Sequence, residues 1–239
     1  MNFDIIIIIL FTSIIQSIFG TGVLLFGTPL LLLNDYSFTS ALTILLPVSI
    51  LINILQLINK AKNIDIKFYK KICLFSVPAI ILSLYFVSIN TAFNTNSLIG
   101  AILIVIGLKE VIPAIDKSID FTIKFEKIYL LIMGMIHGIS NLGGALLSAI
   151  VFSKNLTKEQ TRATIAISYL TFAIFQIITL TFSLNSNFLN TNNIMYWLIG
   201  VFIFLVVEKF IYININETIY NKIFTTFLFF TGIFLMFKD

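Results

Sequence analysis

The stretch GMIHGISNLGGALLSAIVFSKN, residues 134–155, is apolar enough to lie in lipid, yet glycines, serines, Asn141 and the chain's only histidine, His137, interrupt it. Unpaired backbone groups are costly inside a bilayer, so interrupted helices occur there only where protein covers the break or a cavity borders it. The stretch therefore predicts a pair of short helices around a binding site. A second glycine-rich interruption, GTG at residues 20–22, is its expected partner.

Composition places the chain in a membrane. Of its 239 residues, 59% are hydrophobic and 11% are charged, and the mean hydropathy is +1.05. A soluble domain needs more charge to cover its surface. The apolar runs have the length of helices and lack the alternation of an outer-membrane barrel. We therefore expect an all-α polytopic membrane protein.

Several functional classes are disfavoured by the residues present. The single cysteine, Cys73, allows no internal disulfide and no multi-cysteine metal site. No Gly-rich loop ending in lysine is present to bind a nucleotide phosphate. The net charge of +4 is assigned to loops facing the cytoplasm, so it does not call for a nucleic-acid partner. We expect no metal and no cofactor.

Apolar windows predict a series of helical segments along the chain. They are residues 3–19, 23–34, 38–59, 72–89, 97–114, 127–139, 142–153, 160–183, 194–213 and 218–237. Segments 23–34 and 142–153 are too short to span a hydrocarbon core of roughly 30 Å at about 1.5 Å per residue. Each follows another apolar segment across an interruption, so each pair is either a re-entrant hairpin or two short crossings.

The distribution of lysine sets the expected orientation. The segments KAKNIDIKFYKK (60–71) and SKNLTKEQTR (153–162) are basic, whereas NTAFNTN (90–96) and LNSNFLNTNN (184–193) carry no charge. Basic loops face the cytoplasm in membrane proteins. Counting crossings from these loops places both termini outside.

Displacing the chain by half its length aligns its two interruptions and also aligns Gln56 with Gln176. Each half then reads as a Gly-broken helix pair followed by three transmembrane helices, and the two halves cross in opposite directions. We therefore expect two inverted repeats, 1–119 and 120–239, within one membrane domain. Inverted repeats with broken helices point to secondary transporters whose site lies between the halves.

The residues that carry a family resemblance surround both interruptions. They are FGTGVLLFGTPLLLL (19–33) with SFTSALTILLP (37–47), and HGISNLGGALLSAIVF (137–152) with LTKEQTRATIAISYL (156–170). This double arrangement resembles the sulfite exporter TauE/SafE family. The resemblance implies an anion transporter of the bacterial inner membrane, acting on sulfite, sulfonates or other sulfur-containing organic anions.

The interruptions themselves offer chemistry for an anion. A short helix begins after each one, and a helix N-terminus presents unpaired N–H groups and about half a positive charge. Two such termini form an anion site without a buried cation. The candidate ligand-binding residues here are Gly20, Thr21, Gly22, Ser140, Asn141, Gly143 and Gly144. The alternative is that the glycines only allow close helix packing.

Four further residues are candidates for substrate binding. Histidine side chains ordinarily titrate near neutral pH, and His137 lies within an apolar segment, although it is equally suited to a hydrogen bond between helices. Arg162, the only arginine, suits an anion entering from the cytoplasm, or it anchors the helix at the interface. Gln56 and Gln176 line the axis between the halves, or they join helices by hydrogen bonds.

These observations favour a secondary transporter or uniporter that exports a small anion, and not an enzyme. Two alternatives remain open. One is an integral-membrane enzyme of the acyltransferase kind, which needs a nucleophile or base that the sequence does not cluster. The other is a non-catalytic membrane subunit. The expected partners are the anion and the lipid bilayer, and a homodimer stays an open alternative.

Overall fold

The computed structural model describes residues 2–58, 60–90, 95–108, 112, 117, 121–184, 193–210, 226 and 229–238. Its helices are α1 (Phe3–Phe19), α2 (Val23–Leu33), α3 (Phe38–Leu57), α4 (Ile66–Ile89), α5 (Thr95–Gly107), α7 (Glu126–Ser140), α8 (Gly143–Phe152), α9 (Lys158–Leu184) and α10 (Ile194–Phe210), with a 3₁₀ turn, η1 (Ala61–Asn63). A further helical stretch covers residues 229–236. In these ranges the prediction of an all-helical chain is confirmed.

Three of these helices, α3, α4 and α9, are long and apolar enough to cross a membrane. The helices α2 and α8 have 11 and 10 residues, in agreement with the short segments expected from the sequence. The expected segments 97–114, 194–213 and 218–237 extend partly beyond the described residues.

Helix α4 begins six residues before the apolar segment that was expected at 72–89. Asp65 caps its N-terminus, because a carboxylate oxygen accepts the N–H of Phe68 at 3.0 Å. Lys67 and Lys71 therefore lie on the first turns of the helix rather than in a loop. Lysine can occupy such positions because its long side chain reaches the water at the membrane surface.

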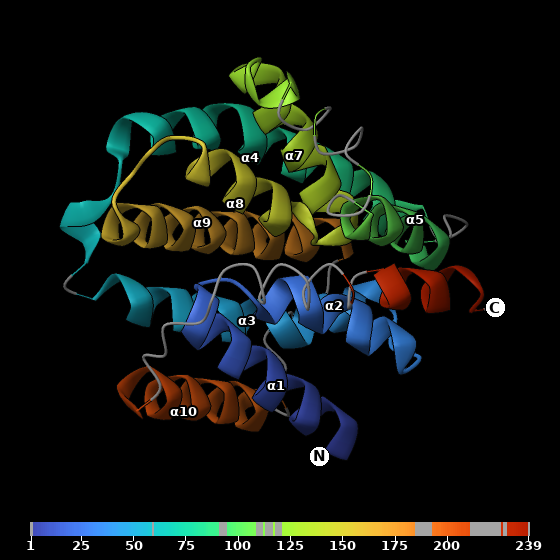
Figure 1. Ribbon diagram of the computed structural model, residues 1–239. Coiled ribbons are helices and arrows are strands. Elements are labelled where there is room, and N and C mark those ends of the chain that lie inside the picture. Colours follow the sequence, from blue (N-terminus) through green and yellow to red (C-terminus); the bar gives the residue numbers. More distant parts are fainter. Residues whose placement is uncertain are drawn as a thin grey trace.

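The helices pack in two groups, and each group contains one helix from the other half of the sequence (Figure 1). Helix α4 packs along α7 and α9, while α10 packs along α1 and α3. Helices α3 and α9 pack against one another, and α2 also touches α8. The turn that contains η1 lies at the left of Figure 1, and the C-terminus lies at the right. Helix α4 of the first half thus packs against the second half, and α10 of the second half packs against the first.

The contact between α4 and α7 depends on glycine. A Cβ added at Gly134 would lie 2.5 Å from the carbonyl oxygen of Ser76 and 2.9 Å from its Cα. The Ser76 hydroxyl also donates to the Leu130 carbonyl across this contact, at 2.8 Å. The backbones therefore meet without room for a methyl group, as small residues allow between membrane helices.

We expect Gly134→Ala to lower the stability of the purified protein by about 1–3 kcal/mol, the usual cost of overpacking, because the methyl group meets backbone atoms that cannot turn aside. Gly27→Ala is the matched control, since its methyl group would meet only the side-chain end of Leu45, at 2.8 and 2.9 Å. Thermal unfolding in detergent measures both. Equal loss of stability would contradict a rigid crossing at Gly134.

Candidate functional site

The first interruption separates α1 from α2. Gly20 ends α1 in the left-handed region, at φ 81°, and its N–H donates to the Gln16 carbonyl at 2.8 Å. Gly22 precedes α2, and a Cβ there would lie 2.8 Å from the Gln16 backbone nitrogen and 3.0 Å from the Thr12 carbonyl oxygen. Gly22 thus lets α2 fold back closely against α1. Thr21, between them, is buried.

A buried amide covers the N-terminus of α2. The Val23 N–H donates to Oε1 of Gln16 at 2.9 Å. The same Gln16 side chain donates through Nε2 to Asn53 at 3.4 Å, and its backbone carbonyl accepts from Nε2 of Gln56 at 3.2 Å. An oxygen of the protein itself therefore occupies part of the position at which the sequence predicts an anion. Gln16 is a site residue that the sequence analysis did not identify.

The second interruption is built around Asn141. This residue adopts the left-handed region, at φ 65°, and its N–H donates to the His137 carbonyl at 2.8 Å. Its side chain donates to the Thr28 hydroxyl of α2 at 2.9 Å and accepts from Nε2 of Gln176 at 3.2 Å. Asn141 therefore connects the second break to α2 and α9.

Ser140 also serves the backbone of this break. Its hydroxyl donates to the Ile136 carbonyl at 2.6 Å and accepts the N–H of Leu142 at 3.2 Å. This arrangement keeps the turn closed between the end of α7 and the start of α8. Ser140 is thus held in the break by local contacts of its own helix.

At the N-terminus of α8 the N-cap residue Leu142 offers no side-chain acceptor, and its own N–H donates to Oγ of Ser140. Among the described residues no side chain accepts from Gly143 or Gly144 as Gln16 accepts from Val23 at the start of α2. Gly143 and Gly144 form the first turn of α8, and both are buried. A Cβ at Gly143 would lie 2.5 Å from Cβ of His137, and one at Gly144 would lie 1.2 Å from the hydroxyl oxygen of Tyr169. The two glycines therefore let His137 of α7 and the Tyr169 ring of α9 lie close to the start of α8.

His137 is completely buried at this point, with an exposed fraction of 0%. Its ring lies edge-on to Tyr169, with 5.9 Å between centroids, and at 5.0 Å from the Phe172 centroid. Within the described part of the chain neither ring nitrogen makes a hydrogen bond of good geometry, although the Gln176 side chain lies close enough to interact with the imidazole. Oε1 of Gln176 is likewise without a hydrogen bond of good geometry. Buried polar atoms are usually satisfied in native proteins, so such a group marks a place where a polar ligand fits.

The two glutamines at equivalent positions behave alike. Gln56 donates through Nε2 to the Gln16 carbonyl in the last turn of α1, and Gln176 donates through Nε2 to Oδ1 of Asn141 at the second break. Each also keeps a buried Oε1 with no hydrogen-bond partner among the described residues. Both lie on the helices α3 and α9, which pack against one another.

Arg162 lies at the first break, although it belongs to the second half of the chain. Its Nη2 donates to the Ser17 carbonyl at 2.8 Å, and its Cγ would lie 3.4 Å from a Cβ placed on Gly20. Glu208 is the neighbouring carboxylate, at 3.8 Å. The guanidinium is therefore away from the hydrogen-bonded group of Asn141 and Gln176.

The candidate residues thus form two groups. One contains His137, Ser140, Asn141, Gly143, Gly144 and Gln176, and the other contains Gly20, Thr21, Gly22, Gln56 and Arg162. The hydrogen bond from Asn141 to Thr28 connects the His137 group to α2, the helix that follows the first break. Among the described residues no group of three or more His, Cys, Asp or Glu side chains is placed to hold a metal ion.

We expect Gly144→Ala to lower stability by about 1–3 kcal/mol, because the methyl group would overlap the Tyr169 hydroxyl. Tyr169→Leu removes that hydroxyl, so the cost of Gly144→Ala should be smaller in the double variant. A double-mutant cycle on thermal unfolding in detergent measures this coupling. Simple additivity would mean that the phenol does not meet α8 at Gly144.

The comparisons with known proteins agree with the resemblance drawn from the glycine-rich motifs. The family model described as sulfite exporter TauE/SafE matches residues 5–235, a span that includes both interruptions. Comparison with curated proteins finds no match, and comparison with solved structures finds none. The chain therefore belongs to the sulfite exporter TauE/SafE family, a family of membrane anion transporters.

Proposed function

We propose that this protein is a multi-pass uniporter of the bacterial inner membrane that exports a small sulfur-containing anion, such as sulfite or a sulfonate. Family membership supports the transport of an anion. The observation that carries the assignment of a site is the buried N-terminus of α8, whose N-cap residue Leu142 offers no side-chain acceptor. Beside it lie the ring nitrogens of His137 and Oε1 of Gln176, which make no hydrogen bond of good geometry in the described residues.

The α8 terminus suits an oxyanion for electrostatic reasons. Its first N–H groups point toward the break, and the helix contributes about half a positive charge there. His137 and the Gln176 amide add neutral hydrogen-bonding groups, so the anion is bound without a buried cation and can be released again. The N-terminus of α2 contributes a second half charge if Gln16 withdraws its oxygen from Val23.

The inverted repeat is part of this proposal. The exchange of helices between the halves supports it, because α4 packs on α7 and α9 as α10 packs on α1 and α3. The matched behaviour of Gln56 and Gln176 supports it further. In such a pair of repeats, 1–119 and 120–239, rocking of one half against the other exposes a central site alternately to each side.

The direction of transport follows from the membrane potential. With the cytoplasm negative, each exported negative charge gains about 2.3 kcal/mol per 100 mV. The carboxylates of the described residues all lie at or near helix ends; they are Asp4, Asp35, Asp65, Glu126, Glu159 and Glu208. Export down this potential needs no coupling ion, which is the reason for proposing a uniporter.

The decisive experiment is flux into liposomes that contain only the purified protein. We expect sulfite or methanesulfonate to move in the direction set by an imposed potassium-diffusion potential, at a rate that saturates with anion concentration. Protein-free liposomes give the background. An absence of flux with folded protein would contradict the proposed transport, and turnover of an acyl donor would favour the enzyme alternative.

We expect His137→Leu to weaken anion binding about tenfold or more, because a hydrogen bond to a charged group contributes about 1.5–3 kcal/mol. His137→Gln keeps a hydrogen-bonding group and should retain most of the affinity. The readout is the stabilisation of the purified variants by sulfite in thermal unfolding. If both variants bind sulfite as the parent does, His137 is a packing residue between α7 and α9.

A further inference from the structure

Glu208 near the end of α10 is shared by two cations. Its Oε1 lies 3.8 Å from Nη2 of Arg162 and 3.6 Å from Nζ of Lys60. The side chains of Arg162 and Glu208 are 12% and 25% exposed. At these separations the carboxylate balances the charge of the guanidinium without a short hydrogen bond between the paired atoms.

Arg162 is positioned by the backbone rather than by this carboxylate. Its Nη2 donates to the Ser17 carbonyl in the last turn of α1, at 2.8 Å. Its stem passes over Gly20, where no Cβ stands in the way. A guanidinium carries five N–H donors in a planar fork, so one that donates to a carbonyl can also pair with an anionic oxygen, as Arg162 does with Glu208.

We propose that Glu208 is a resident counter-ion that an incoming anion replaces on Arg162, so that Glu208 sets the affinity for substrate at the cytoplasmic mouth. This inference rests on the proposed transport function. Arg162 lies at the first break and at the basic end of the molecule, where an anion from the cytoplasm arrives first. Glu208 is then a positioning residue that acts through Arg162.

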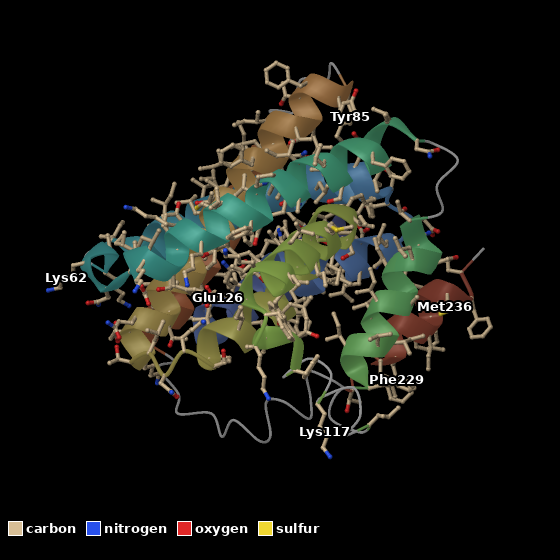
Figure 2. All side chains as sticks on the ribbon, turned by 90° about the horizontal axis from the view of Figure 1, so that it is seen from above. Lys62, Tyr85, Lys117, Glu126, Phe229 and Met236 are labelled. Atoms are coloured by element: carbon tan, nitrogen blue, oxygen red, sulfur yellow. The ribbon has the colours of Figure 1, made fainter. Side chains whose placement is uncertain are left out.

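A second bridging carboxylate provides a matched control. Glu126 at the start of α7 also bridges two cations, Lys71 at 2.5 Å and Lys154. Its side-chain hydrogen bonds among the described residues join it to these two lysines and not to a residue of either break. Figure 2 shows Glu126 between Lys62 and Met236. Neutralising Glu126 changes the net charge as neutralising Glu208 does, without touching Arg162.

The test is the concentration dependence of sulfite uptake into inside-out membrane vesicles, in which the cytoplasmic mouth faces the medium. We expect Glu208→Gln to lower KM about two- to fivefold at an unchanged maximal rate, since partly exposed ion pairs are weak. Glu126→Gln should leave KM unchanged. In an Arg162→Gln background, Glu208→Gln should no longer lower KM, although Lys60 is still released.

The failure of this inference is distinguishable from failure of the proposed function. If the parent protein transports sulfite and Glu208→Gln has the same KM as Glu126→Gln, Glu208 does not compete with the substrate. Glu208→Gln and Glu208→Asp could instead both lower the maximal rate and the melting temperature at constant KM. The cluster would then be a structural contact, and the inference would be overturned. If the parent carries no sulfite, the proposed function fails instead.

Discussion

The structure depends on one constraint, which is that backbone groups released at a helix break inside an apolar protein must find partners. Each break leaves N–H groups without carbonyls at the start of a short helix. At both breaks a glutamine from the following long helix serves an acceptor rather than these N–H groups: Nε2 of Gln56 donates to the Gln16 carbonyl, and Nε2 of Gln176 donates to Oδ1 of Asn141. The packing of α3 on α9 therefore fixes the two breaks together.

The two breaks satisfy this constraint differently, and the difference separates structure from function. At α2 the protein supplies the oxygen, because Gln16 accepts the Val23 N–H. At α8 no side chain in the described part of the chain accepts from Gly143 or Gly144, and the ring nitrogens of His137 and Oε1 of Gln176 make no hydrogen bond of good geometry there. A folded protein tolerates such a group where ligand binding repays its cost. The second break is therefore the stronger candidate for the ligand.

The sequence predicted the positions of both breaks because short apolar segments and glycines are local signals. It did not predict Gln16, since a glutamine in an apolar helix carries no local sign of the N–H it covers. It placed the start of α4 too late because the lysines on the first turns lower the hydropathy there, although Asp65 caps the helix before them. The position of Arg162 over Gly20 depends on packing between distant segments, which hydropathy and charge do not encode.

The exchange of helices between the halves gives Arg162 its importance. Arg162 belongs to α9, which packs on α3 and α4, while its partners Ser17 and Glu208 belong to α1 and α10, which pack on each other. The guanidinium therefore crosses the boundary between the two packed groups. Any rocking of one group against the other must lengthen these contacts. In the proposed transport cycle, the contact between Arg162 and Glu208 is broken most easily when a mobile anion replaces the carboxylate of Glu208.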